Sequence, residues 1–468
     1  MTDYQFLGMD SASEVPVPQG YRVMRGWRYF AIPPQGEVML QAVQRDNPTL
    51  KGQTALRIAV ALDDREVKRV EVFLAKSGRV LGELDIRYAH VFQPFELLLS
   101  AEDGEAIKSE QLGLRLVEGT APLWVLNSSD MSPALTPHLL GQANGNPQQE
   151  FYRRLASLDS LQFFGWQEGC VLNGLLDLRG IIPSQHVDQT IKLHLDSFFD
   201  AAGVLDYEDD FSRPRREIYG IECTLPFAAL AQINPEHPAL RAAVDFWLSL
   251  RDNSGAIQDA DMLSAEGSYT VAYPMAQLAI SLNMPKLREI AIQQLRLRMG
   301  LFEADRLALR RYHDGTRTFE NWCRGVAWYL LGLARTLPLL PDPPSDLVSE
   351  FRRVAAWVVQ FQNLEGIWHT FVDEPNILPD SSGSAGIAAA LAIGATHGLL
   401  PSARQESAMR ARDALISGYL TSDGFLRGVA QVNKGGEALQ RAPYRVISQM
   451  GMGLLGQLIA AAPNGVEF

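Results

Sequence analysis

Cysteine is scarce in this sequence, long apolar runs are absent, and basic residues are outnumbered by acidic ones. The 468 residues include three cysteines, Cys170, Cys223 and Cys323, which lie too far apart for the close pairing seen in zinc sites. We expect them to be reduced and buried. No apolar stretch reaches the roughly 20 residues of a membrane span, and the N-terminus lacks the basic and apolar regions of a signal peptide. We therefore expect a cytoplasmic protein with no membrane partner.

The charge balance and the missing motifs narrow the function further. Acidic residues number 54 and basic residues 42, and the resulting net charge of −12 repels polyanions. A nucleic-acid partner is not expected. The sequence has no Gly-rich phosphate loop, no HExxH zinc motif and no nucleophile elbow of a serine hydrolase. We therefore expect no metal ion and no organic cofactor.

The first part of the chain has the pattern of a β-sandwich. Between residues 21 and 126, short runs of alternating apolar and polar residues are separated by turn residues, for example at 55–62, 70–74 and 94–99. Residues 127–149 are rich in Asn, Ser, Pro and Gly, which is typical of a linker. We predict a β-sandwich domain over residues 1–130, a linker over 131–148 and a second domain over 149–468.

Two kinds of helix alternate in the second part. One kind is amphipathic: between residues 346 and 363 apolar residues recur every three or four positions, which buries one face. Similar segments begin near residues 149, 186, 238, 285 and 403, which makes six. The other kind is apolar on all sides, and six such helices follow Glu168, Glu222, Glu266, Trp322, Ser382 and Gln449.

This alternation indicates a repeat. Successive members of the six residues before the apolar helices are 44 to 67 positions apart, which is enough for one outer and one inner helix with their loops. A helix that is apolar all round needs a cover on every side. Six outer and six inner helices therefore predict a closed double ring, an (α/α)6 barrel. The protein is expected to be mainly α-helical, with an N-terminal β-sandwich domain. An open α-solenoid is the alternative.

The starts of the inner helices locate the candidate site. All inner helices of such a barrel point the same way, so their starts meet at one end, where a small-molecule pocket belongs. Three residues at these starts are the glutamates Glu168, Glu222 and Glu266. A single glutamate there would only favour the helix dipole. Several carboxylates at one rim suit glycosidic chemistry, which needs a proton donor and an ionised partner.

Other side chains in the same loops fit a sugar acid. Aromatic rings can stack on sugars, arginine can bind a carboxylate through two hydrogen bonds, and histidine can bind a hydroxyl group. The candidates for these contacts are His313, Trp322, Arg324, Trp368, His369, Ser382 and Arg445. Arg427 and Lys434 are further cations that fit a plain surface role equally well.

Six segments resemble a known family: IECTLPFAAL, AEGSYTVAYPMAQLA, HDGTRTFENWCRGVAWYLLGL, GIWHTFVD, DSSGSAGIAAALAIGA and YRVISQMGMGLLGQLIAA. In this order they are similar to glycoside hydrolase families 88 and 105, the unsaturated glucuronyl and rhamnogalacturonyl hydrolases, over roughly residues 150–465. The W-x-R-G-x-x-W run at 322–328 is the most specific piece. An N-terminal β domain is not part of the basic family architecture.

The resemblance implies a reaction and a set of roles. The family adds water to a 4,5-unsaturated uronic acid at the non-reducing end of an oligosaccharide, without a cofactor. The family's two catalytic aspartates match Glu266, as the proton donor, and Glu222, which assists the water. Arg324 would hold the uronate, and His313 and Trp322 would line its subsite. Both catalytic positions are Glu where the family has Asp, and the extra methylene moves each carboxylate by more than about 1 Å.

Three other functions stay open. Two glutamates could hydrolyse a saturated β-glucuronide directly. An isomerase would use His313 and His369 for proton transfer, because sugar 2-epimerases of the same fold use two histidines. A non-catalytic protein would bind carbohydrate or a second copy of the chain through the β domain, which makes that domain the candidate surface for a homo-oligomer.

Overall fold

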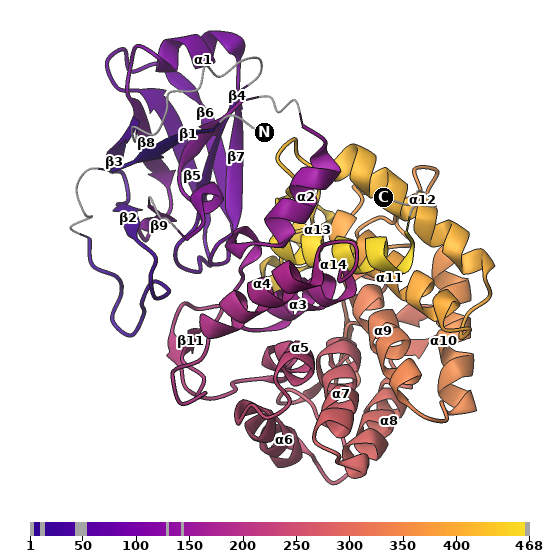
Figure 1. Cartoon of the computed structure of the whole chain (residues 1–468). Helices are drawn as coiled ribbons and strands as arrows, with labels where there is room; N and C mark the ends of the chain where they lie inside the picture. Colours follow the sequence, from indigo (N-terminus) through magenta and orange to yellow (C-terminus); the bar gives the residue numbers. More distant parts are fainter. Residues whose placement is uncertain (1–3, 10–14, 43–53, 128–130, 142–144, 464–468) are drawn as a thin grey trace.

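Two domains lie side by side in the computed structural model of the chain, a β domain and a helical domain (Figure 1). The structure describes residues 4–9, 15–42, 54–127, 131–141 and 145–463. Within these ranges no helix combines the length and the apolar character needed to cross a bilayer. Cys170, Cys223 and Cys323 are buried free thiols, so their prediction as core residues is confirmed.

The β domain contains ten strands and one short helix among its described residues. The strands are β1 (Tyr4–Gly8), β2 (Tyr29–Ile32), β3 (Glu37–Ala42), β4 (Thr54–Ala59), β5 (Val67–Leu74), β6 (Val80–Arg87), β7 (Pro94–Leu99), β8 (Leu112–Glu118), β9 (Leu123–Leu126) and β10 (His138–Leu140), and the helix is α1 (Ala101–Ile107). Eight strands form one sheet in the order β6-β5-β8-β3-β1-β10-β4-β7, and β2 pairs with β9. All of these pairs are antiparallel.

The large sheet folds over a shared core, as the predicted β-sandwich requires. Its two four-stranded halves join where β1 pairs with β3 at Leu7 and Gly8. The far strands β6 and β7 also approach closely, since a β-carbon on Gly82 would lie 2.8 Å from the side chain of Leu97. Along β5, Val70 and Val72 are fully buried and Glu71 between them is partly exposed, because alternate residues of a strand share a face.

The predicted linker belongs largely to the β domain. Strand β10 lies between β1 and β4 and pairs with both, and η1 (Pro133–Leu135) precedes it. The sheet therefore runs to Leu140 rather than ending at residue 130. The burial of all three residues of β10 in the sheet decides the structure here, although the composition around them is typical of a linker. Parts of the three predicted segments lie outside the described residues, namely 1–3, 10–14, 43–53, 128–130, 142–144 and 464–468.

The helical domain has the predicted six outer and six inner helices within its described residues. The outer helices are α2 (Pro147–Leu155), α4 (Ser184–Asp196), α6 (Ala239–Leu250), α8 (Pro285–Met299), α10 (Ser345–Val359) and α12 (Ala403–Tyr419). The inner helices are α3 (Trp166–Asp177), α5 (Pro226–Ile233), α7 (Tyr273–Ser281), α9 (Cys323–Thr336), α11 (Ser381–Thr396) and α14 (Gln449–Ala461). The short helix α13 (Gly436–Arg441) lies in the loop before α14.

Glycines close the ring between its first and last inner helices. A β-carbon on Gly453 of α14 would lie 2.4 Å from the carbonyl oxygen of Cys170 on α3, and one on Gly174 of α3 would lie 2.4 Å from the carbonyl oxygen of Gly453. No side chain fits at such distances, so glycine is required for this backbone approach. Because α14 packs on α3, the barrel is closed and the open solenoid is excluded.

The β domain covers the end of the barrel at which the inner helices start. The loop between β6 and β7, residues 88–93, lies against this end. Gln449 at the start of α14 donates a hydrogen bond of 2.8 Å to the carbonyl oxygen of Phe92, and Gln431 donates one of 2.7 Å to that of Arg87. Beside this loop, Arg65 of the β domain forms an ion pair with Asp210 of the helical domain.

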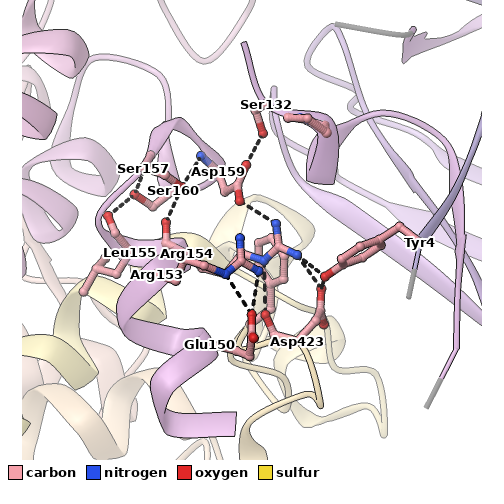
Figure 2. Close-up of polar contacts among 12 residues, drawn as sticks. Tyr4, Ser132, Glu150, Arg153, Arg154, Leu155, Ser157, Asp159, Ser160 and Asp423 are labelled. Atoms are coloured by element: carbon pink, nitrogen blue, oxygen red, sulfur yellow. Dashed lines mark hydrogen bonds and ion pairs between the residues drawn. The ribbon is translucent and has the colours of Figure 1, made fainter. Parts of the chain in front are cut away.

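A buried charge cluster joins the two domains (Figure 2). Asp423, in the loop after α12, accepts hydrogen bonds from Arg57 on β4 at 2.6 and 3.0 Å and from Tyr4 on β1 at 3.0 Å. Arg154 on α2 reaches the same carboxylate at 3.3 Å. The side chains of Arg57 and Asp423 are 1% and 0% exposed. Burial opposes the charge, but the two arginines hold the pKa of Asp423 well below its usual range.

Candidate active site

Glu222 and Glu266 lie together at the covered end of the barrel. Glu222 is in η3 (Ile221–Thr224), the turn that leads into α5. Glu266 is between the strand β13 (Met262–Ser264) and η4 (Ser268–Ala272), the π-helical turn that leads into α7. Each carboxylate therefore stands just before an inner helix, as predicted, and both line one enclosed hollow.

Burial raises the pKa values of both carboxyl groups. Burial and the charge of Glu266 raise the pKa of Glu222 to about 8. Burial also raises the pKa of Glu266, which Arg310 and a hydrogen bond from Glu222 partly offset. With a pKa of about 8, Glu222 holds its proton at neutral pH and can act as an acid, and Glu266 is the second carboxyl group that lines the hollow. Two carboxyl groups in such a setting can serve as the acid and the base of proton-transfer chemistry.

The hollow is walled by residues from both domains. Besides the two glutamates, its lining consists of His90, Trp166, Asp210, Trp322, Arg324, Trp328, Val432, Asn433 and Lys434. Three of these are tryptophans, the kind of side chain that suits a sugar ring. Lys434 and Asp210 form an ion pair with each other across the wall.

The hollow is small, with a volume of about 20 Å³. That volume holds about one water molecule, so a sugar can enter only after some of the lining moves. A much larger open groove of about 1290 Å³ runs between α4 and the end of α5. Its carboxylates include Asp188 and Asp196, which are half exposed and paired with Arg179 and Lys192. That groove lacks a buried acid, so it does not compete as a catalytic site.

Trp322 and Arg324 are two further predicted residues that the structure brings to the hollow. The Arg324 guanidinium lies 4.6 Å from the centre of the Trp322 ring. Its two terminal nitrogens donate hydrogen bonds of 2.6 Å to the carbonyl oxygens of Ala430 and Gln431. Arg324 thus positions the loop before η6 (Asn433–Gly435), the turn that carries Lys434.

Glu168 does not join the other two glutamates. It lies in the first turn of α3 and is fully buried. One of its oxygens is 2.7 Å from Nδ1 of His194 on α4, and the other accepts a hydrogen bond from the backbone of Gln162. Both oxygens are therefore occupied in fixing α3 to its outer helix, and the expected rim of three glutamates holds two.

The remaining predicted residues also lie outside the hollow, where most of them hold loops in place. Trp368 donates to the carbonyl oxygen of Val358, Ser382 donates to Asp380, and Nδ1 of His369 lies 2.6 Å from the carbonyl oxygen of Ile377. Arg445 donates to Pro379, Leu378 and Thr370, His313 is exposed beside Gln258, and Arg427 is exposed on the surface.

The structure adds residues that the sequence did not single out. Asp210 comes from the long loop before α5, and His90 comes from the β domain. Lys434, which the sequence left as either a ligand or a surface residue, lines the hollow. No sequence signal marks His90 or Asp210, because His90 reaches the site only through the docking of the two domains and Asp210 lies in the long loop before α5 rather than at a helix start. Among the described residues, no group of three or more potential ligands is arranged to hold a metal ion.

Comparison with known proteins identifies the helical domain. Residues 145–461 match Glycosyl Hydrolase Family 88. The unsaturated rhamnogalacturonyl hydrolase YesR of Bacillus subtilis (strain 168) is 32% identical over 155 residues, which are 31% of this chain and 43% of that protein. The chain therefore spans less than half the length of this curated relative.

Solved structures share the fold at low identity. The unsaturated glucuronyl hydrolase of Bacillus sp. GL1 has a TM-score of 0.52 and 16% identity, covering 68% of this chain and 95% of that one. A family 105 glycoside hydrolase of C. acetobutylicum has a TM-score of 0.57 and 19% identity, covering 65% of this chain and 94% of that one. Since the family match extends over more than half of the sequence, the protein belongs to glycosyl hydrolase family 88.

Proposed function

We propose that the protein removes a 4,5-unsaturated uronyl residue from the non-reducing end of an oligosaccharide by adding water to its double bond. The observation that carries this proposal is that Glu222, whose pKa is raised, and Glu266 are buried and line the same hollow. Family membership supports it. So do the names of one relative and one solved structure, an unsaturated rhamnogalacturonyl hydrolase and an unsaturated glucuronyl hydrolase.

The reaction needs one carboxyl group that gives a proton to the substrate and one that takes a proton from water. The protonated carboxyl gives its proton to C4 of the uronyl residue, water bonds to C5, and the ionised carboxylate accepts a proton from that water. The hemiketal formed at C5 opens, and the hemiacetal left at C1 then releases the next sugar. The pair ends with the proton count with which it began. The higher pKa favours Glu222 as donor in the free enzyme, whereas the family resemblance assigns that role to Glu266.

Family membership and the lining of the hollow favour hydration over the alternatives. Direct hydrolysis of a saturated glycoside also uses two carboxyl groups, so the preference over that reaction rests on the match to family 88. An isomerase with two histidines finds no support, because neither His313 nor His369 lines the hollow. An inert carbohydrate-binding barrel would have no need of two buried acids that line one hollow.

A choice between two substrates tests the proposal. We expect the protein to remove the ultraviolet absorbance of an unsaturated uronyl disaccharide and to leave 4-nitrophenyl β-glucuronide intact. Both assays use the same enzyme preparation, and the unsaturated product of a polysaccharide lyase serves as the first substrate. Release of nitrophenol without loss of the double bond would replace the proposal with direct hydrolysis.

The pH dependence of the rate tests the raised pKa of Glu222. Because Glu222 loses its proton near pH 8, kcat/KM for the unsaturated disaccharide should fall about tenfold per pH unit at higher pH. In acid the rate should fall again when the pair takes up a second proton. The residual rate of Glu222→Gln should lack the alkaline fall, since glutamine does not titrate. A wild-type rate that stays level well above pH 8 would contradict a role for protonated Glu222.

A further inference from the structure

One wall of the hollow comes from outside the family-88 segment. His90 lies in the β6–β7 loop of the β domain, while the match to the family begins at residue 145. Two residues of this loop, Tyr88 and Phe92, have positive φ angles of 50° and 68°. Such angles are unfavourable for large side chains, and the hydrogen bonds from Gln431 and Gln449 to the backbone of the loop hold it there. The barrel thus fixes the position of His90.

His90 is buried without the hydrogen bonds that a buried histidine usually makes. Its side chain is 5% exposed. Nδ1 lies 3.5 Å from Asp63 Oδ1, whereas Nε2 has no hydrogen-bond partner among the described residues. Most buried polar groups are paired, so an exception of this kind calls for a cause. The ring borders the hollow that contains Glu222 and Glu266, and a second hollow of about 10 Å³ beside Arg324.

The position of His90 indicates what it would meet there. If the terminal uronyl residue lies against Glu222 and Glu266, as the proposed function requires, the sugar bonded to it is the part of the substrate left to meet other lining residues, among them His90, Asp210 and Lys434. These three side chains offer donors and acceptors for hydroxyl groups. Burial lowers the pKa of His90, so the imidazole is neutral, with one N–H donor and one acceptor.

We propose that His90 is a substrate-binding residue supplied by the β domain, and that its imidazole hydrogen-bonds a hydroxyl group of the sugar that is released. This inference rests on the proposed function and adds a specificity determinant to it. The helical domain would carry out the chemistry, and the β domain would recognise the sugar next to the cleaved bond.

Two substrates with different leaving groups test the proposal. One is an unsaturated uronyl disaccharide, and the other is an unsaturated uronyl residue bonded to 4-nitrophenol, which has no sugar hydroxyl groups. His90→Ala should lower kcat/KM for the disaccharide about tenfold and leave that for the aryl compound nearly unchanged. His90→Gln, which keeps a donor and an acceptor, should restore part of the loss. His138→Ala, which removes another buried histidine of the same domain, should leave the ratio between the substrates unchanged.

The outcomes separate the two proposals. If the wild-type protein converts neither unsaturated compound, the proposed function fails. If it converts both but His90→Ala and His90→Gln lower the two rates equally, the role of His90 is structural and this inference is overturned. Unchanged rates in both variants would overturn it as well. A loss confined to the disaccharide supports it.

Discussion

Glu266→Gln is expected to lower kcat on an unsaturated uronyl disaccharide by about 10²- to 10⁴-fold, the usual contribution of a positioned acid or base. Glu222→Gln should cause a loss of the same order. Each change removes either the proton donor or the proton acceptor of the reaction, because glutamine neither gives nor accepts the proton. The measurement is the initial rate at saturating substrate, with thermal unfolding followed to show that each variant is folded.

The double variant gives the sharper result. When two residues act as one catalytic unit, replacing either of them costs about as much rate as replacing both. The variant that combines Glu222→Gln and Glu266→Gln should therefore be little slower than the slower single variant. Glu365→Gln, an exposed glutamate in the loop after α10, is the matched control and should keep the wild-type rate. If the loss of kcat in the double variant equals the product of the two single losses, the glutamates act in separate steps. Unchanged rates in the variants would place the chemistry elsewhere.

Asp423→Ala is expected to destabilise the protein by about 3–5 kcal/mol, the typical effect of removing one partner from a buried ion pair. The variant leaves Arg57 and Arg154 buried without the carboxylate they share at the domain boundary. The free energy of unfolding in urea measures the effect. Arg153→Gln removes a neighbouring ion pair whose arginine is 55% exposed, and it should cost less than about 1 kcal/mol.

The effect of Asp423 should depend on pH. Its pKa in the folded protein is below the value of about 3.9 expected in the unfolded chain. The stabilisation is therefore complete above that pH and is lost as the pH falls through the folded-state pKa. The difference in free energy of unfolding between wild type and Asp423→Ala should therefore become smaller in acid. A difference that does not change with pH, or similar losses of stability in Asp423→Ala and Arg153→Gln, would show that the cluster contributes little.

The fold could be predicted from the sequence because its signal is local and repeated. Helix α11 buries every residue from Ser381 to Ala392, and its sequence is apolar on all sides, which is possible only for an inner helix. Outer helices such as α10 show the complementary pattern of one buried face. Strand β10 was harder to predict, because three buried residues are too few to show a period.

The candidate site could be predicted in part, since a repeat locates helix starts but not the direction of each side chain. Glu222 and Glu266 precede their helices, whereas Glu168 is already inside the first turn of α3. Successive residues of a helix point about 100° apart, so a shift of two positions turns a side chain away from the barrel axis. His90 and Asp210 could not be found, because their place depends on contacts between segments distant in sequence.

The charge cluster around Asp423 also bears on the ancestry of the protein. An ancestral barrel that gained or lost the β domain in one step would have left Asp423 and Arg154 without Arg57 and Tyr4. In a barrel that stands alone, Asp423 and Arg154 would face water, where their ion pair contributes little. Asp423 is therefore expected to be retained together with the β domain and to be free to change in a barrel without one.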